Sequence, residues 1–523
     1  DARVTIAQED SVRWRVVAPG GAAVITYRLA LPPAESPRAA WRPFLSPTGG
    51  LTGGPHTFMY VVGQELAPAH VELRMPPSWG VVTGLTRTAD DRTYFAANSY
   101  VLMESPIFVG RFNTSRFAVD GVPHTIAYWP SPNATRFDTT ALRDGIERVT
   151  NEAVKLFGRP PYREYVFVLQ DNAYGGLEHH NSVTQAAPSR QLAENLEEFL
   201  GELSHEFIHT WNLMRIRPAE YIGVTHRRIQ PVSTYWFSEG LTMFYADLLR
   251  RRAGLPVSGA NRTDHLERIL ARYLAIPGHS RFSAEQVSRA AYNSTPEALG
   301  DYSASSHLQG EVLGALLDLI IRDATDGKRS MDHVMRLLHE RTGGPAGMTS
   351  ADLEAAVASV CACVVKPFFD AYVRGAQPLN YNRYLSLIGL KAEVRWDTVT
   401  SENGSKAPDH RLWAFNQPGD SLLALAINNP ETIWGKAGLH SGERVVTLQG
   451  NSVRTWGEFR RDLSTSRIGD PVHLVVKPRG ALPARTVTVI VDGYTRPVVT
   501  LTEIPGTTEK QIRLREAWSN GSP

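Results

Sequence analysis

The run His205-Glu206-Phe207-Ile208-His209 combines residue types that can bind a metal ion and activate water. Two histidines four positions apart project from one side of an α-helix, so both imidazoles can bind one zinc ion. Glu206 follows the first histidine, where its carboxylate can take a proton from a water molecule beside the metal. A chance HExxH run is expected on the order of once in a hundred chains of this length. The pattern therefore predicts a catalytic zinc site.

The surrounding segment has the periodicity of a helix. Its apolar residues recur at steps of three and four, the spacing of one helical face: Leu192, Leu196, Phe199, Leu200, Leu203, Phe207, Ile208 and Trp211. A catalytic zinc site needs a third protein ligand and an open position for water. Glu239 begins a second helical pattern downstream and is the expected third ligand. The alternative, a glutamate that only complements the helix dipole, is less favoured beside two histidines that lack a third ligand.

Two segments resemble a known family. Ser204 to Pro218 reads SHEFIHTWNLMRIRP and resembles the glycyl aminopeptidase family of metallopeptidases, whose members carry a closely similar run ending in Arg-Ile-Arg-Pro. The WFSEG segment that contains Glu239 resembles that family's third-ligand motif. The resemblance covers nearly the whole chain. It implies a thermolysin-like gluzincin with one Zn²⁺ ion held by His205, His209 and Glu239, and a preference for small N-terminal residues, Gly and Ala.

A glycine-rich segment upstream predicts where a substrate amine binds. The apolar run from Tyr165 to Gln170 is typical of a strand and leads into Tyr174-Gly175-Gly176-Leu177-Glu178. The glycines Gly175 and Gly176 let a peptide backbone approach closely, and Glu178 can hold a charged N-terminus by a charge-assisted hydrogen bond. The segment resembles the Gly-x-Met-Glu-type motif of related gluzincin aminopeptidases, in which the glutamate recognises the free α-amine. The alternative is a turn with a solvated glutamate.

The donor for the developing oxyanion is less defined. Related aminopeptidases use a tyrosine in a Tyr-x-Lys-Gly context, and the corresponding segment here is Ser305 to Gly310, SSHLQG. His307 stands at the position of the tyrosine and can donate a hydrogen bond, so it is the preferred candidate. Tyr302 is the rival, and a histidine that only caps or packs in its helix is the third possibility.

Composition indicates an ordinary globular enzyme. The chain has 523 residues, of which 42% are hydrophobic and 21% charged, with a net charge of +2. This balance argues against a nucleic-acid or membrane-surface role. No apolar run reaches the roughly 18 residues of a membrane helix. A start at Asp1 suits a mature periplasmic or secreted protein, with a cytoplasmic one as the alternative. The two cysteines, Cys361 and Cys363, are read as small packing residues because they stand too close for an ordinary structural disulfide.

The predicted fold class is multidomain α+β. Residues 1–125 form an all-β domain with strands such as Ala23 to Ala30, and residues 126–375 form a thermolysin-like, mainly helical catalytic domain. Residues 376–495 form a PDZ-like, β-rich domain, and residues 496–523 a C-terminal tail that lies along another domain or is partly flexible.

The PDZ-like assignment rests on one run. Lys436 to Val446 resembles the Ala-Gly-Leu-x-x-Gly-Asp-x-Ile run of PDZ domains, which bind peptide C-termini by adding a strand to a sheet edge. No Gly-Leu-Gly-Phe-type carboxylate loop precedes Ala424 to Ile427. Ligand capture and a packing or substrate-gating role therefore both stay open.

These features together predict a zinc aminopeptidase that acts on peptides with a free N-terminus. One alternative is a zinc endopeptidase with a PDZ-like substrate-recruiting module, in which Glu178 has no amine to bind. A second is a non-catalytic peptide-binding protein, against which the intact His205, Glu206, His209 and Glu239 argue. The sequence carries no prediction of the oligomeric state.

Overall fold

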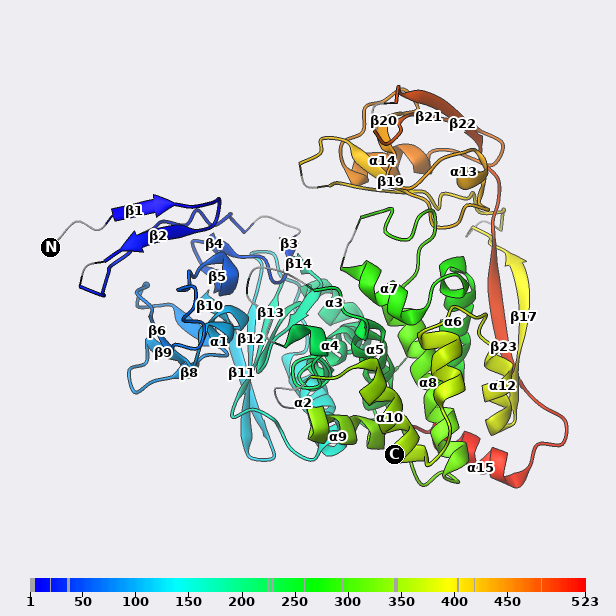
Figure 1. Cartoon of the computed structure of the whole chain (residues 1–523), viewed down its shortest axis with the longest axis horizontal. Helices are drawn as coiled ribbons and strands as arrows, with labels where there is room; N and C mark the ends of the chain where they lie inside the picture. Colours follow the sequence, from blue (N-terminus) through cyan, green and yellow to red (C-terminus); the bar gives the residue numbers. More distant parts are fainter. Residues whose placement is uncertain are drawn as a thin grey trace. The chain divides into compact units, whose positions relative to one another are not determined.

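A computed structural model describes residues 5–18, 20–34, 38–222, 226, 230–257, 259–292, 295–342, 347–401, 404–417, 419–480 and 482–523. The chain forms two compact units, Asp1–Arg111 and Phe112–Pro523 (Figure 1). The first is β-rich, and the second contains a helical region and a C-terminal β-rich region. The predicted multidomain α+β class is therefore confirmed.

The N-terminal unit consists of short antiparallel strands around a small core. Its elements are β1 (Thr5–Gln8), β2 (Trp14–Val17), β4 (Phe44–Ser46), β5 (Gly49–Gly53), β6 (Ala69–Glu72), β7 (Gly80–Thr83), β8 (Thr86–Arg87), β9 (Thr93–Ala96), α1 (Ser99–Glu104) and β10 (Pro106–Gly110). The strands pair as β1-β2, β4-β5-β10-β7 and β6-β9-β8. At Gly50 a Cβ atom would lie 2.6 Å from the carbonyl oxygen of Phe44, so the tight β4–β5 hairpin requires glycine there.

Two sequence-based expectations differ from this unit. The unit ends at Arg111 rather than at residue 125, because the two strands that follow pair within the sheet of the second unit. The expected strand from Ala23 to Ala30 is absent, and these residues are exposed without a partner strand. A β-prone segment remains irregular when no neighbouring strand satisfies its backbone.

A five-stranded mixed sheet begins the second unit. Its order is β11-β12-β13-β16-β15, with bounds β11 (Asn113–Val119), β12 (Val122–Trp129), β13 (Tyr165–Gln170), β16 (Ser182–Ala186) and β15 (Gly176–Glu178). Strands β12, β13 and β16 are parallel, whereas β15 runs antiparallel to β16 at the sheet edge. All residues of β13 are buried, as expected for a strand covered on both faces. The expected strand from Tyr165 to Gln170 is thus present.

Helices pack beside this sheet and form the main core. They are α2 (Thr139–Phe157), α3 (Ser189–Glu194), α4 (Leu196–Ile208), α5 (Tyr235–Arg252), α6 (Arg262–Leu274), α7 (Ala284–Ala291), α8 (Ser306–Ala324), α9 (Met331–Thr342), α10 (Ser350–Cys361), α11 (Lys366–Phe368) and α12 (Tyr381–Leu385). Asp138 caps α2 by accepting hydrogen bonds from two backbone amides, and Gly158 ends it at a φ of 92°. No described helix is long and apolar enough to cross a membrane.

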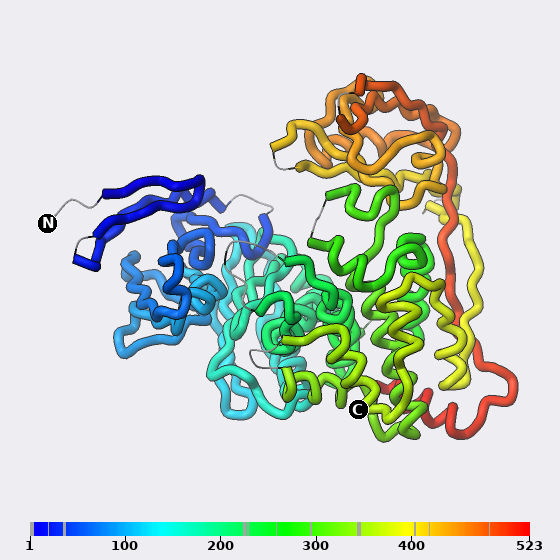
Figure 2. Tube along the Cα trace, in the orientation of Figure 1, coloured from blue at the N-terminus to red at the C-terminus, as the bar shows by residue number. Residues whose placement is uncertain are grey.

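The C-terminal region contains a two-stranded sheet and a five-stranded sheet. Strands β17 (Leu390–Thr398) and β23 (Thr495–Glu503) pair antiparallel and run alongside each other in the trace (Figure 2). Between them in sequence lies what we call the C-terminal β domain, residues 413–490. It holds the sheet β18-β19-β20-β21-β22 and two helices: β18 (Trp413–Phe415), β19 (Leu423–Ala426), α13 (Ile433–Lys436), β20 (Arg444–Leu448), α14 (Trp456–Ser464), β21 (Pro471–Lys477) and β22 (Arg485–Ile490). Its assignment as PDZ-like stays a prediction.

The residues after 495 take the first of the two expected forms and lie along the rest of the chain, because β23 is paired and α15 (Glu509–Ser519) buries Trp518 against the helices. One further expectation needs correction. Cys361 and Cys363 form a disulfide. Ala362 between them adopts a left-handed conformation with a φ of 50°, which reverses the chain and brings the two Cα atoms to 5.1 Å.

Candidate zinc site

Helix α4 presents the HExxH run to the interior. Asn195 caps its N-terminus by accepting a hydrogen bond from the Glu198 amide at 3.3 Å, and two glutamates in the first turn complement the helix dipole. Phe199, Leu203 and Phe207 bury the apolar face. The predicted helical periodicity therefore places His205 and His209 on one side of α4 and at its C-terminal end.

Three potential ligand atoms converge between α4 and α5. The Nε2 atoms of His205 and His209 lie 3.1 Å apart, and Glu239 Oε2 lies 3.2 Å from the first and 3.3 Å from the second. Atoms bound to zinc at about 2.0–2.1 Å in tetrahedral geometry lie roughly 3.3 Å from one another. The spacing of the two nitrogens and one oxygen thus fits a zinc ion.

The second ligand histidine is oriented by its neighbours. His209 Nδ1 lies 2.9 Å from the backbone oxygen of Asn212, which fixes the ring and leaves Nε2 to face the cluster. The Asn212 side chain donates to the carbonyl oxygens of Phe237 and Ser238, at 3.3 and 2.9 Å. Asn212 therefore ties the end of α4 to the first turn of α5, beside Glu239.

A close helix crossing brings α8 to the same place. A Cβ atom on Gly310 would collide with the Trp236 carbonyl oxygen, and one on Gly240 would lie 2.5 Å from the Glu311 amide nitrogen. Only glycines allow α5 and α8 to approach this closely. As a result His307, in the first turn of α8, has its Nε2 atom 2.9 Å from Glu239 Oε2.

A second group of acidic residues adjoins the ligands. Ligand atoms of Glu178, Glu206 and His209 lie within 4.8 Å of one another. Gly176 packs directly on the base candidate, because a Cβ atom there would lie 2.6 Å from Glu206 Cγ and would collide with Gln185 Oε1. Gly175 has a φ of 72°, so it supplies the left-handed turn into β15.

The charge balance favours a bound cation. Burial lowers the pKa of His205 to about 4, so this imidazole is neutral and can bind through Nε2. Burial opposes the charge of His209, but the carboxylates of Glu239, Glu178 and Glu206 outweigh it and raise its pKa to about 10. Burial also raises the pKa of Glu206 to about 8. Three carboxylates grouped with two imidazoles, with Glu239 buried, are an environment that a divalent cation neutralises.

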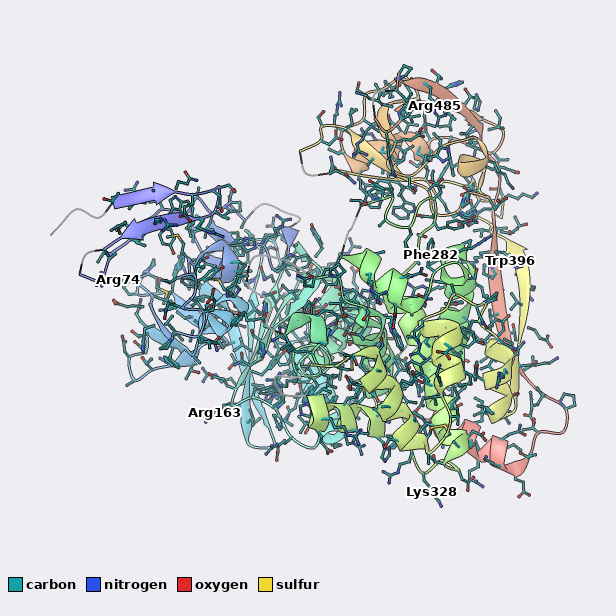
Figure 3. All side chains as sticks on the ribbon, in the orientation of Figure 1. Arg74, Arg163, Phe282, Lys328, Trp396 and Arg485 are labelled. Atoms are coloured by element: carbon teal, nitrogen blue, oxygen red, sulfur yellow. A yellow bond between two sulfur atoms is a disulfide. The ribbon has the colours of Figure 1, made fainter. Side chains whose placement is uncertain are left out.

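The two oxyanion candidates lie in different surroundings. The His307 ring stacks on His205 with centroids 5.8 Å apart, and its Nε2 atom faces Glu239. Tyr302 instead packs edge-on against Phe282, which Figure 3 labels, with centroids 6.1 Å apart, and Arg281 lies over its ring. Among the described residues, no contact joins Tyr302 to the metal cluster.

Sequence reasoning missed Tyr235. Its ring lies edge-on to His307 with centroids 6.2 Å apart. Burial, the charges of Glu239 and Glu178 and a hydrogen bond to Glu239 raise the pKa of its hydroxyl. The spacing in the sequence could have identified it, because Tyr235 precedes Glu239 by four residues and therefore shares a helix face with it.

Comparisons with known proteins identify two family domains in the chain and a similar fold. Residues 1–111 match the M61 peptidase N-terminal domain, and residues 198–313 match the M61 glycyl aminopeptidase domain. An aminopeptidase N family protein from Idiomarina loihiensis has a similar fold, with a TM-score of 0.72 at 19% identity over 98% of this chain and 89% of that one. An M1 zinc metallopeptidase from Deinococcus radiodurans, solved with a Tyr-Ser-Ala substrate, gives a TM-score of 0.46 at 16% identity over 67% of this chain and 74% of that one. No curated protein matches the sequence.

The family match spans α4, α5 and the first turn of α8, so it contains both histidines of the HExxH run, Glu239 and His307. The chain therefore carries the N-terminal domain and the glycyl aminopeptidase domain of the M61 family, and it is a zinc metallopeptidase.

Proposed function

We propose that this enzyme removes small N-terminal residues, Gly and Ala, from peptides, and that it uses one zinc ion held by His205, His209 and Glu239. The position of Glu178 carries the proposal. It is the last residue of the edge strand β15, and its carboxylate joins the cluster of Glu206 and His209. A carboxylate that close to the reacting groups suits the α-amine of a peptide whose first bond is cleaved.

The metal and Glu206 would perform different steps of peptide hydrolysis. Zinc, when bound, polarises the scissile carbonyl and lowers the pKa of a water molecule in the site. Glu206 takes the proton from that water and delivers it to the leaving amine. Burial raises the pKa of Glu206 and so favours its protonated form, which is the form that delivers a proton to the leaving amine. Gly176 packs against this side chain so closely that no Cβ atom fits between them without a shift.

His307 is the proposed donor to the developing oxyanion. Its Nε2 atom lies 2.9 Å from the Glu239 oxygen that also contacts the two histidines of the HExxH run, which supports a role for this imidazole near the reacting carbonyl. Tyr302, the rival, contacts Phe282 and Arg281 instead. Replacing His307 by Phe is expected to lower kcat more than substrate affinity, whereas Tyr302→Phe is expected to leave both unchanged. The opposite pattern would transfer the role to Tyr302.

The edge strand supports binding of an extended peptide. β15 pairs with β16 on one side only, among the strands that the structure describes, so its other side can accept a substrate backbone. A peptide bound there reaches Glu178 at the end of the strand.

An Ala-led peptide and its N-acetylated twin test the proposal, with products followed by mass spectrometry. We expect cleavage of the free peptide one residue at a time and no cleavage of the acetylated one, because acetylation removes the charge that Glu178 holds. Internal cleavage of both peptides would mean an endopeptidase. Glu178→Gln is expected to raise KM for the free peptide, and Glu206→Gln to abolish turnover while zinc stays bound.

A side-chain series tests the preference for small residues. Peptides that differ only in an N-terminal Gly, Ala, Leu or Phe are compared by kcat/KM. Equal values for all four would contradict the preference without affecting the aminopeptidase assignment.

A further inference from the structure

The C-terminal β domain contacts the chain just before α8. We call residues 299–305 the α8 entry segment. Asp301 in this segment accepts a hydrogen bond from the Ser441 amide at 2.7 Å, and its other oxygen lies 2.7 Å from His440 Nδ1. The Ser303 amide donates to the carbonyl oxygen of Asn428 at 3.2 Å. Two loops of the C-terminal β domain, after β19 and before β20, thus hold one short segment.

The catalytic region holds the same segment from the other side. The Ser305 amide donates to His279 Nε2 at 3.0 Å, and His279 Nδ1 lies 3.1 Å from the carbonyl oxygen of Tyr273. Burial lowers the pKa of His279 to about 4, so the ring is neutral and its Nδ1–H donates to Tyr273. A Cβ atom on Gly278 would lie 2.8 Å from the carbonyl carbon of Ser303, so the backbones are in close contact.

The segment leads directly to the proposed oxyanion donor. Ser305 caps α8 by accepting a hydrogen bond from the Leu308 amide at 3.2 Å, and His307 follows in the first turn. The histidine sits where its Nε2 atom is 2.9 Å from Glu239. A shift of the entry segment would move the cap and the first turn of α8, and with them the imidazole.

Aromatic side chains of the C-terminal β domain stack between its edge strand β18 and α14. Trp413 on the edge strand β18 stacks on Trp456 of α14, with centroids 5.0 Å apart and planes 11° apart. Phe459 of α14 extends the stack, with its ring 5.9 Å from Trp456. An added strand would have to displace this aromatic stack. The contacts with the α8 entry segment are therefore the feature that points to a role for this domain.

We propose that Asp301 is a positioning residue for the peptidase reaction, through which the C-terminal β domain holds His307 at the site. The inference rests on the proposed role of His307 as oxyanion donor. Asp301 contacts no ligand in the cluster, so its effect passes through the α8 entry segment. The recorded contacts of Asp301 go to His440 and Ser441 rather than to the proposed zinc ligands or to Glu178, so the effect is expected in kcat rather than in KM.

Full-length Asp301→Ala is compared with Asp420→Ala. Asp420 pairs with Arg444 at 2.5 Å inside the C-terminal β domain and is similarly exposed, but does not contact the entry segment. We expect Asp301→Ala to lower kcat on an Ala-led peptide about 10-fold with KM and zinc content unchanged, and Asp420→Ala to stay within about twofold. Asp301→Asn, which keeps an acceptor for the Ser441 amide, is expected to recover most of kcat. Equal kcat values for the two alanine variants would overturn the proposal.

Two further measurements separate positioning from general damage. In a His307→Ala background, Asp301→Ala is expected to cause no further loss of kcat, because the group on which it acts is gone. Independent, multiplied losses would overturn the proposal. Hydrogen exchange of residues 299–310 needs no turnover and is expected to rise in Asp301→Ala but not in Asp420→Ala. Unchanged hydrogen exchange in Asp301→Ala would refute the role of this contact, whether or not the wild-type enzyme cleaves peptides. An inactive wild-type enzyme would refute only the proposed function.

Discussion

Gly176→Ala tests whether the general base is held by the strand that lies against it. Gly176 is part of the extended strand β15 and has no left-handed φ, so its backbone accepts alanine. The added Cβ atom would lie 2.7 Å from Glu206 Cδ. The carboxyl group must therefore recede by about 0.7 Å to reach ordinary contact.

The size of the effect follows from that displacement. A misplacement of about 1 Å in a reacting group can lower the rate about 100-fold. We expect Gly176→Ala to lower kcat by about 10- to 100-fold, or about 1.4–2.7 kcal/mol in the activation free energy. The zinc ligands lie on α4 and α5 rather than on β15, so zinc content is expected to stay unchanged.

The assay is steady-state hydrolysis of an Ala-led peptide together with zinc analysis and thermal unfolding. Gly457→Ala is the matched control, because a Cβ atom there meets nothing within 4 Å. Gly176→Ala combined with Gln185→Ala relieves the collision with the glutamine and leaves the one with Glu206. If the single variant retained full kcat, or if the double variant recovered it, the packing of Gly176 on Glu206 would not control the base.

The remaining predictions concern the supports of the site and of the core. Asn212→Ala is expected to weaken zinc binding about 10- to 100-fold in a chelator competition, because it releases the loop that orients His209; unchanged affinity would exclude this role. Tyr235→Phe is expected to lower kcat without changing the unfolding temperature, since it removes a hydroxyl beside Glu239; a loss of stability alone would make Tyr235 structural. Asp318→Asn is expected to cost about 3 kcal/mol of stability, because it leaves the buried Arg322 without its carboxylate partner. Burial opposes ionisation of Asp318, but its arginine neighbours lower its pKa, so this difference should be complete near pH 7 and shrink below about pH 4 in denaturation curves; a pH-independent difference would contradict it.

The sequence predicts those parts of the site that depend on local spacing. His205 and His209 need only one helix, and the apolar periodicity around them specifies it. The contact of His307 with Glu239 depends on how closely α5 and α8 cross, which is set by Gly240 and Gly310 on two helices far apart in the chain. No single-segment pattern contains that information, so sequence reasoning left His307 and Tyr302 as alternatives.

A single segment also does not show which neighbours it will have, and this explains where the observed fold differs from the predicted one. The residues from Ala23 to Ala30 have strand propensity but no partner, and pairing is not encoded in the segment itself. Cys361 and Cys363 are joined because Ala362 takes a left-handed conformation at the end of α10, which its residue type does not favour. Both cases depend on what surrounds the segment rather than on its composition.

The shared carboxylate makes the site sensitive to two separate movements. Glu239 Oε2 contacts His205, His209 and His307, so a shift of α5 is expected to change zinc binding and the position of the proposed oxyanion donor together. A shift of the α8 entry segment is expected to move the proposed donor alone, because the three proposed ligands lie on α4 and α5. Damage at the α5–α8 crossing should therefore lower zinc affinity and kcat in parallel, whereas damage at the contact with the C-terminal β domain should lower kcat alone. Measuring zinc affinity and turnover in the same variants therefore distinguishes the α5–α8 crossing from the contact with the C-terminal β domain.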